Sequence, residues 1–165
     1  MTDAHAPLVD AAHAAFIQAG VSISVGGCDR NNRPSLARAT GCRVAPDGRR
    51  LVIFVSAVQA APLLQCLRDN GSIAVVFTQP STHRTVQFKG IDAVVGDLQD
   101  GDLQRIRNYR DAFCSELEPM GFSKIQIRTL LAVPPADLVT LEFTPGEAYS
   151  QTPGPHAGEV LKANP

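Results

Sequence analysis

The sequence has no long apolar run. Nowhere in its 165 residues do eighteen consecutive apolar side chains occur, so no segment has the length that a membrane-spanning helix needs. The N-terminal stretch MTDAHAPLVDAAHAAFIQAG has no basic start and no sustained apolar centre, and so differs from a signal peptide. We therefore expect a cytoplasmic protein with no membrane partner.

Paired cysteines are also missing. The four cysteines form no CxxC arrangement, and none has a histidine at ligand spacing; they are Cys28, Cys42, Cys66 and Cys114. Four cysteines in a chain of this size do not make a disulfide framework. We expect no metal site and reduced cysteines, which favours a reducing compartment.

A surplus of positive charge is absent too. Lys and Arg total 15 against 16 Asp and Glu, which leaves a net charge of −1. Nucleic-acid binders usually carry a basic surplus, so the sequence predicts no nucleic-acid partner. The chain also has no glycine-rich phosphate loop, no GxSxG and no HExxH. Its four histidines are scattered, and we name no catalytic residue.

Apolar spacing divides the chain into helices and strands. It predicts helices over 7–19, 60–71, 100–121 and 123–133, and strands over 21–29, 35–44, 51–56, 72–79, 84–98 and 136–146. Short hairpins dominate, so the sheet should be antiparallel, and six strands with long central members indicate a small barrel. The predicted fold class is mainly β (α+β), with one domain over 1–150. Residues 151–165 form a Pro/Gly-rich C-terminal tail.

A polar face alternates along the strand that begins HRTVQFKG. Val86 and Phe88 point to one side and should face the core. Thr85, Gln87 and Lys89 point to the other side and place a hydroxyl, an amide and an ammonium in one row. This row is either a solvated face or one wall of a polar ligand site.

Other polar residues fall at strand ends. Ser56 closes a strand just before a helix, and the helix N-terminus near Gln59 offers N–H groups to an anion. Thr78 closes the next strand, and Arg84 begins the one after it. These residues converge on one edge of the barrel if they form a site. In the simpler interpretation, which the pattern alone favours, Ser56 is a helix cap and the row faces water.

Several stretches together resemble the pyridoxamine 5'-phosphate oxidase-like proteins. The resemblance runs from NRPSLARATGCRV through LVIFVSAVQAAPLLQCLRDNGSIAVVFTQPSTHRTVQFKG and covers about residues 15–150. The ending FTPGEAYSQTPGP is similar to a tail of uncharacterised bacterial members. The resemblance implies a six-stranded antiparallel split β-barrel with peripheral helices. It also implies a homodimer that binds FMN in a groove at the subunit interface.

The resemblance further implies where the flavin phosphate would be held. The family places two basic residues on the second strand and an Arg-Lys pair at the start of the helix after the third strand. In this sequence those positions fall on Ala37, Cys42, Ala60 and Ala61. The family's glutamine early in the fifth strand falls on Thr85. A phosphate dianion needs charge-assisted partners, so these departures matter.

Nearby basic residues are candidates to substitute. Arg38 and Arg43 are each one residue out of place, and a shift of one residue turns a strand side chain to the opposite face unless a bulge intervenes. Arg84 and Lys89 are further candidates, together with the amide of Gln87.

The leading hypothesis is an FMN-dependent oxidoreductase of unknown substrate. Its candidate cofactor-binding residues are Arg38, Ser56, Gln59, Thr78, Arg84, Thr85, Gln87 and Lys89. The altered phosphate positions, and an ending that lacks a basic substrate-binding segment, argue against a true pyridoxamine 5'-phosphate oxidase. The alternative is a non-catalytic dimeric protein that binds flavin, deazaflavin or haem, with His83 as a candidate haem ligand. A scaffold with an empty groove is the third hypothesis.

Overall fold

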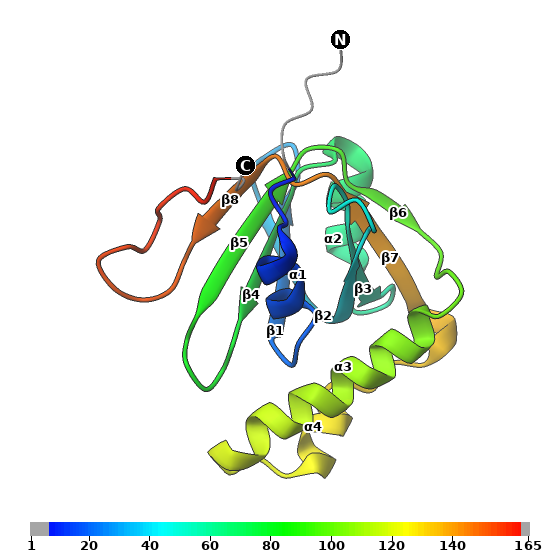
Figure 1. Ribbon diagram of the computed structural model, residues 1–165. Coiled ribbons are helices and arrows are strands. Elements are labelled where there is room, and N and C mark those ends of the chain that lie inside the picture. The colour runs from blue at the N-terminus through cyan, green and yellow to red at the C-terminus, as the bar shows by residue number, and fades with distance from the viewer. Residues whose placement is uncertain (1–6, 163–165) are drawn as a thin grey trace.

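One antiparallel sheet forms the body of the molecule (Figure 1). The computed structural model describes residues 7–162. Its strands are β1 Ser22–Cys28, β2 Pro34–Val44, β3 Leu51–Ser56, β4 Ile73–Thr78, β5 Thr85–Gly90, β6 Val94–Gly96, β7 Leu138–Phe143 and β8 Glu147–Ser150. Its helices are α1 Ala11–Ile17, α2 Ala61–Asn70, α3 Asp102–Leu117 and α4 Lys124–Leu130, with short 3-10 turns at Glu118–Met120 and Pro135–Asp137.

The α+β class and the antiparallel sheet are confirmed, whereas the strand number needs correction from six to eight. The strand order is β6-β7-β3-β2-β1-β4-β5-β8, and the sheet stays open between β6 and β8. The segment predicted as one strand over 84–98 is two strands, β5 and β6, which lie far apart in this order. The second additional strand, β8, pairs with β5.

Close packing explains why the long strand divides at Gly90. A Cβ on this residue would lie 2.6 Å from Phe143 Cδ2 and 2.8 Å from the carbonyl oxygen of Thr144. A glycine therefore lets the end of β5 pass directly against the end of β7. The chain then turns away, and Ala93 donates its N–H to the carbonyl of Gly71 at 3.0 Å. β6 consequently pairs with β7, at the other edge of the sheet.

The central position predicted for the strand LVIFVS is confirmed, because all six residues of β3 are buried. Leu51, Ile53 and Val55 pack into the main core. Val52 and Phe54 point to the opposite face, where they pack with Ile106 of α3 and with Leu138. The apolar character of both faces of β3 therefore reflects two layers, with α3 covering the second face.

A bulge interrupts β2 where it pairs with β3. The register shifts between Ala39 and Cys42, and Gly41 has φ +131°, which favours glycine. Cys42 consequently turns into the main core, and Arg43 reaches Asp102 of α3, with 3.0 Å between Nε and Oδ1. Because Asp102 is fully buried, Arg43 is committed to neutralising this carboxylate.

α4 begins with a capping box. Ser123 Oγ accepts the N–H of Gln126, and the Gln126 side chain accepts the N–H of Ser123 in return. We expect Ser123→Ala to lower the free energy of unfolding by about 1 kcal/mol, because one orphan amide loses its partner. Urea denaturation measures this change in the free energy of unfolding. The control is Ser115→Ala on the exposed face of α3, where we expect a change within about 0.5 kcal/mol. Equal midpoints for the two variants would contradict the cap.

Backbone hydrogen bonds hold the segment after β8, which the sequence predicts as a tail. Gln151 donates its N–H to the carbonyl of Thr85, and Leu161 donates to that of Ala148. Tyr149 and Val160 form an isolated antiparallel bridge. Residues 151–162 thus return along β8.

Residues 7–162 bear on the expectations about membrane spans, metal sites and disulfides. Between residues 7 and 162, no helix is long and apolar enough to cross a bilayer. The described residues also contain no cluster of three or more potential metal ligands. All four cysteines, which lie within this range, are free thiols.

Candidate functional site

Four polar side chains from neighbouring strands form one connected line, here called the polar row: Arg38, Ser22, Thr78 and Thr85. Arg38 on β2 donates from Nη1 to Ser22 Oγ on β1 at 3.2 Å. Ser22 pairs with Thr78 on β4, and Thr78 pairs with Thr85 on β5, so the side chains share one face of the sheet. The two threonine hydroxyls are 3.1 Å apart. The fold thus brings three predicted site residues together and adds Ser22.

A pocket of about 480 Å³, the Arg38 pocket, opens beside the polar row. One wall carries the guanidinium of Arg38 and the hydroxyls of Ser22 and Thr78. The opposite wall comes from α3, α4 and the turn between them and is apolar apart from Gln126; its apolar residues are Phe113, Leu117, Phe122, Ile127 and Leu130. Apolar walls with a few convergent polar groups are typical of a site for a small organic ligand.

A second guanidinium lies on the same side of β2. Arg110 of α3 donates from Nε to Thr40 Oγ1 at 3.4 Å, and Thr40 is two residues from Arg38, so both side chains leave the strand on one face. Arg110 Nη2 is buried and has no hydrogen-bond partner among residues 7–162. Burial lowers the pKa of Arg110, although arginine stays charged in proteins. Arg110 itself does not line the Arg38 pocket.

The positions that hold phosphate in the resembling family offer no charge here. Cys42 is 6% exposed, and its thiol donates to the carbonyl of Ile17 at 3.2 Å. Burial raises the pKa of the Cys42 thiol, which therefore stays neutral. Ala60 is also buried, and Ala37 and Ala61 carry only methyl groups. A bound phosphate must therefore find other partners in this protein.

Ser56 and Gln59 lie where the chain passes from β3 to α2. Ser56 Oγ accepts the N–H of Gln59 at 3.2 Å, and the Ser56 carbonyl accepts the N–H of Ala60. Ser56 therefore closes a turn before the helix, while the Gln59 side chain is exposed. Because these amides have partners inside the chain, the entry to α2 is a weaker anion site than the sequence predicts. A contact of Ser56 or Gln59 with a cofactor stays a prediction.

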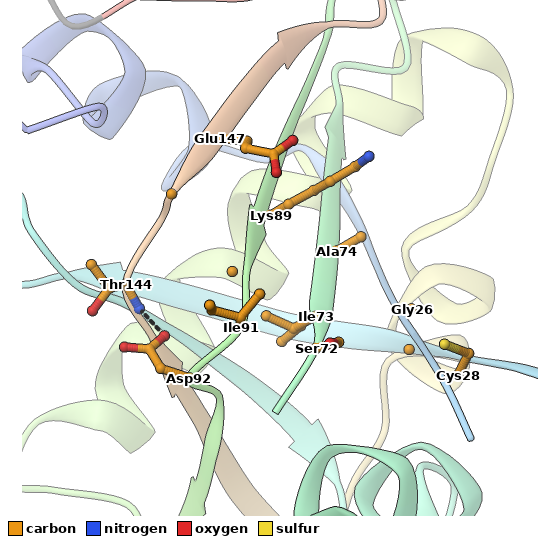
Figure 2. A pocket seen from close by; sticks show the side chains of 13 residues that line it. Gly26, Cys28, Ser72, Ile73, Ala74, Lys89, Ile91, Asp92, Thr144 and Glu147 are labelled. Atoms are coloured by element: carbon orange, nitrogen blue, oxygen red, sulfur yellow. Dashed lines mark hydrogen bonds between the residues drawn. The ribbon is translucent and has the colours of Figure 1, made fainter. Parts of the chain in front are cut away.

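The remaining candidates on and beside β5 do not join the polar row. Arg84 is exposed and lies 4.2 Å above the Phe16 ring, and Gln87 accepts a hydrogen bond from Gln151 Nε2 at 3.3 Å. Lys89 lies four residues from Thr85, or about 13 Å along the strand. It lines a different pocket, shown in Figure 2.

The sequence analysis names neither Ser22, which lines the pocket, nor Arg110, which lies on the same side of β2, and the reasons differ. Ser22 is detectable, because the inward-facing Ile23 and Val25 of β1 imply that Ser22 and Ser24 face outward. Its partner, however, depends on the register between β1 and β4. Arg110 occupies a polar position of an amphipathic helix, so only the docking of α3 on β2 identifies it.

Comparison with known proteins places the fold. No protein-family model matches the sequence. No curated protein matches it either. Several solved structures are similar to this chain. HupZ of Group A Streptococcus has a TM-score of 0.52 at 15% identity, with 88% of this chain and 95% of HupZ covered.

Two further structures match equally well. General stress protein 26 of Bacillus anthracis has a TM-score of 0.52 at 13% identity, with coverages of 90% of this chain and 93% of that one. An F420 reductase has a TM-score of 0.52 at 13% identity, with coverages of 81% and 93%. At these identities the likeness shows the fold alone. The chain has the split-barrel fold of the pyridoxamine 5'-phosphate oxidase-like proteins, as the resemblance implies.

Proposed function

We propose that this protein binds FMN beside the polar row and acts as an oxidoreductase in the cytoplasm, where its free cysteines stay reduced. The observation that carries the proposal is the line from Arg38 to Thr85, which opens into an amphipathic pocket. The resemblance of the sequence supports it, as does the F420 reductase among the structural neighbours.

The residues present fit FMN, although not through the family's phosphate positions. The guanidinium of Arg38 suits a phosphate dianion, because its planar donors match the phosphate oxygens. The hydroxyls of Ser22 and Thr78 can bond the polar edge of a ring. Phe113 and the other apolar residues of the opposite wall suit a flat aromatic surface.

The protein's part in catalysis is then binding, orientation and exclusion of water. When bound, flavin supplies the electron-transfer chemistry. Arg38 fixes the phosphate end, and the hydroxyls of Ser22 and Thr78 set the orientation of the ring by hydrogen bonds. The side chains of α3 and α4 keep bulk water from the ring. The polar row contains no carboxylate, imidazole or thiol, so we assign no proton transfer.

We further propose a homodimer that covers this side of the sheet. Large apolar side chains are exposed on this face of the sheet and on α4, with Leu36 78% exposed and Leu130 57% exposed. Their burial against a second copy would remove apolar surface from water. Sedimentation should give twice the 17.6 kDa chain mass. We expect Leu36→Lys to shift the distribution toward the monomer, whereas a monomeric wild-type protein would contradict the dimer.

An absorption spectrum of the purified protein tests the proposed function. A flavin spectrum, or saturable binding of added FMN, supports it. A deazaflavin spectrum would keep the site and change the cofactor. A Soret band would favour haem instead, with His83 as the ligand to test, since it is exposed in a turn with φ 60°. A colourless protein that binds none of the three contradicts the proposal.

A further inference from the structure

The turn between β4 and β5 connects the two walls of the Arg38 pocket. Pro80 of this turn lines the pocket on the side of the sheet. The residues on either side of Pro80, which are Gln79 and Ser81, both form hydrogen bonds to Glu116 of α3. Figure 1 shows this turn beside the C-terminal half of α3. One carboxylate therefore joins the sheet wall of the pocket to the helix wall.

Glu116 binds this turn through several hydrogen bonds, here called the Glu116 clamp. Its Oε1 accepts the N–H of Ser81 at 3.0 Å and also accepts the Ser81 hydroxyl. The Ser81 hydroxyl, the Ser81 N–H and the Gln79 side chain lower the pKa of Glu116 by donating to it, although desolvation acts in the opposite direction. The carboxylate is therefore ionised at neutral pH, and its hydrogen bonds are charge-assisted.

The turn has its own hydrogen bonds, which fix its shape. Gln79 donates its N–H to the carbonyl of Arg84 at 2.9 Å, and the Thr82 hydroxyl donates to Gln79 Oε1 at 2.9 Å. The Gln79 side chain is thus bonded at its oxygen to Thr82 and at its nitrogen to Glu116. A turn of fixed shape transmits the position of Glu116 to Pro80.

The place of Glu116 on α3 connects the clamp to the apolar wall. Phe113 lies three residues before Glu116, and Leu117 directly follows it; both line the Arg38 pocket. Residues three apart on a helix are neighbours on its surface. The clamp consequently holds the part of α3 that carries these two apolar side chains against the sheet.

We propose that Glu116 is a positioning residue of the Arg38 pocket and sets the distance between its polar and apolar walls. Glu116 does not line the pocket, so it acts through Pro80 and Phe113. The distance matters because a flat ring must contact the hydroxyls of one wall and the apolar side chains of the other at the same time. For its ligand this inference rests on the proposed function, whereas the clamp can be tested without a flavin.

Titrations with riboflavin and FMN test the positioning role. Glu116→Ala should raise the dissociation constants of both ligands by a similar factor, about threefold to tenfold, because the wall that contacts the ring is displaced. Glu116→Gln keeps a side-chain oxygen that can accept the Ser81 N–H, so it should recover most of the wild-type affinity. Glu118→Ala is the matched control, because it removes a nearby exposed carboxylate and its ion pair with Lys124. It should bind both ligands like wild type.

The dye 8-anilinonaphthalene-1-sulfonate tests the clamp without flavin, since this dye binds exposed apolar surface. Glu116→Ala should bind the dye about threefold or more tightly than the wild-type protein, because its apolar wall becomes accessible, and Glu118→Ala should not. Ser81→Ala removes the hydroxyl donor from the exposed turn. It should change dye and flavin binding in the same directions by smaller factors, which keeps the test decisive if Glu116→Ala fails to fold.

The outcomes separate the clamp from the proposed function. Dye binding equal to that of wild type in Glu116→Ala and Ser81→Ala would overturn the clamp. Unchanged flavin affinities in these variants, or no recovery in Glu116→Gln, would overturn the positioning role. A wild-type protein that binds neither riboflavin nor FMN, while the variants still differ in dye binding, would overturn the proposed function and leave the clamp supported.

Discussion

Gly20→Ala is expected to lower the free energy of unfolding by about 3 kcal/mol, the upper part of the range for overpacked sites. A Cβ at this position would lie 2.4 Å from the carbonyl oxygen of Ala112 and 2.8 Å from the backbone nitrogen of Phe113. Both atoms belong to the backbone of α3, which cannot rotate away as a side chain can. The helix must therefore shift as a body.

The displacement of α3 should also reach the site. Tyr109 Oη donates to the carbonyl of Val21 at 2.8 Å, next to Gly20, and Phe113 forms part of the apolar wall. Pushing the helix outward breaks this hydrogen bond and opens the Arg38 pocket. For a chain of this size the melting temperature should fall by about 6–12 °C. Urea and thermal denaturation measure the two effects.

Gly146→Ala is the matched control for this substitution. A Cβ on Gly146 meets only the carbonyl oxygen of Lys89, at 4.0 Å, so the same added methyl group has space. We expect a change within about 0.5 kcal/mol. If Gly20→Ala is as stable as Gly146→Ala, α3 does not dock on the backbone as described.

Arg38→Met should raise the dissociation constant for FMN by about tenfold to a hundredfold, because a hydrogen-bonded charge partner of the phosphate is lost. Riboflavin has the same ring and no phosphate, so its affinity should hardly change. The difference between the two ligands isolates the phosphate end from the ring end. Fluorescence titration of both ligands measures it.

Arg68→Met controls for the loss of one positive charge. Arg68 lies near the end of α2, is exposed and lies outside the Arg38 pocket. We expect its FMN affinity to match that of wild type. If Arg38→Met lowers FMN and riboflavin affinity equally, Arg38 contacts the ring or supports the pocket and does not hold the phosphate.

The sequence predicts local structure well where the alternation of side chains decides it. Val86 and Phe88 are buried as expected, and Gln87 and Lys89 lie half-buried on the other face. The sequence predicts a bend at Gly90. It does not predict that the chain then crosses from β5, near one edge of the sheet, to β6 at the other edge. That step depends on Phe143 and Thr144, which come more than fifty residues later in the chain.

The candidate site is only partly predictable for the same reason. Arg38, Thr78 and Thr85 are recognisable as polar residues in or at the ends of strands, and pairing between strands brings them together. Lys89 is equally polar and alternates correctly, yet its position along β5 places it in another pocket. The alternation of side chains thus predicts on which face of the sheet a residue lies, whereas the register between strands decides which residues become its neighbours on that face.

The most direct measurement is a side-by-side titration of the wild-type protein with FMN and riboflavin, followed by flavin fluorescence. We predict saturable binding of both, with FMN at least about tenfold tighter, since Arg38 recognises the phosphate. Equal affinities would contradict the phosphate site. Absence of binding by either ligand would contradict the assignment of flavin to the polar row.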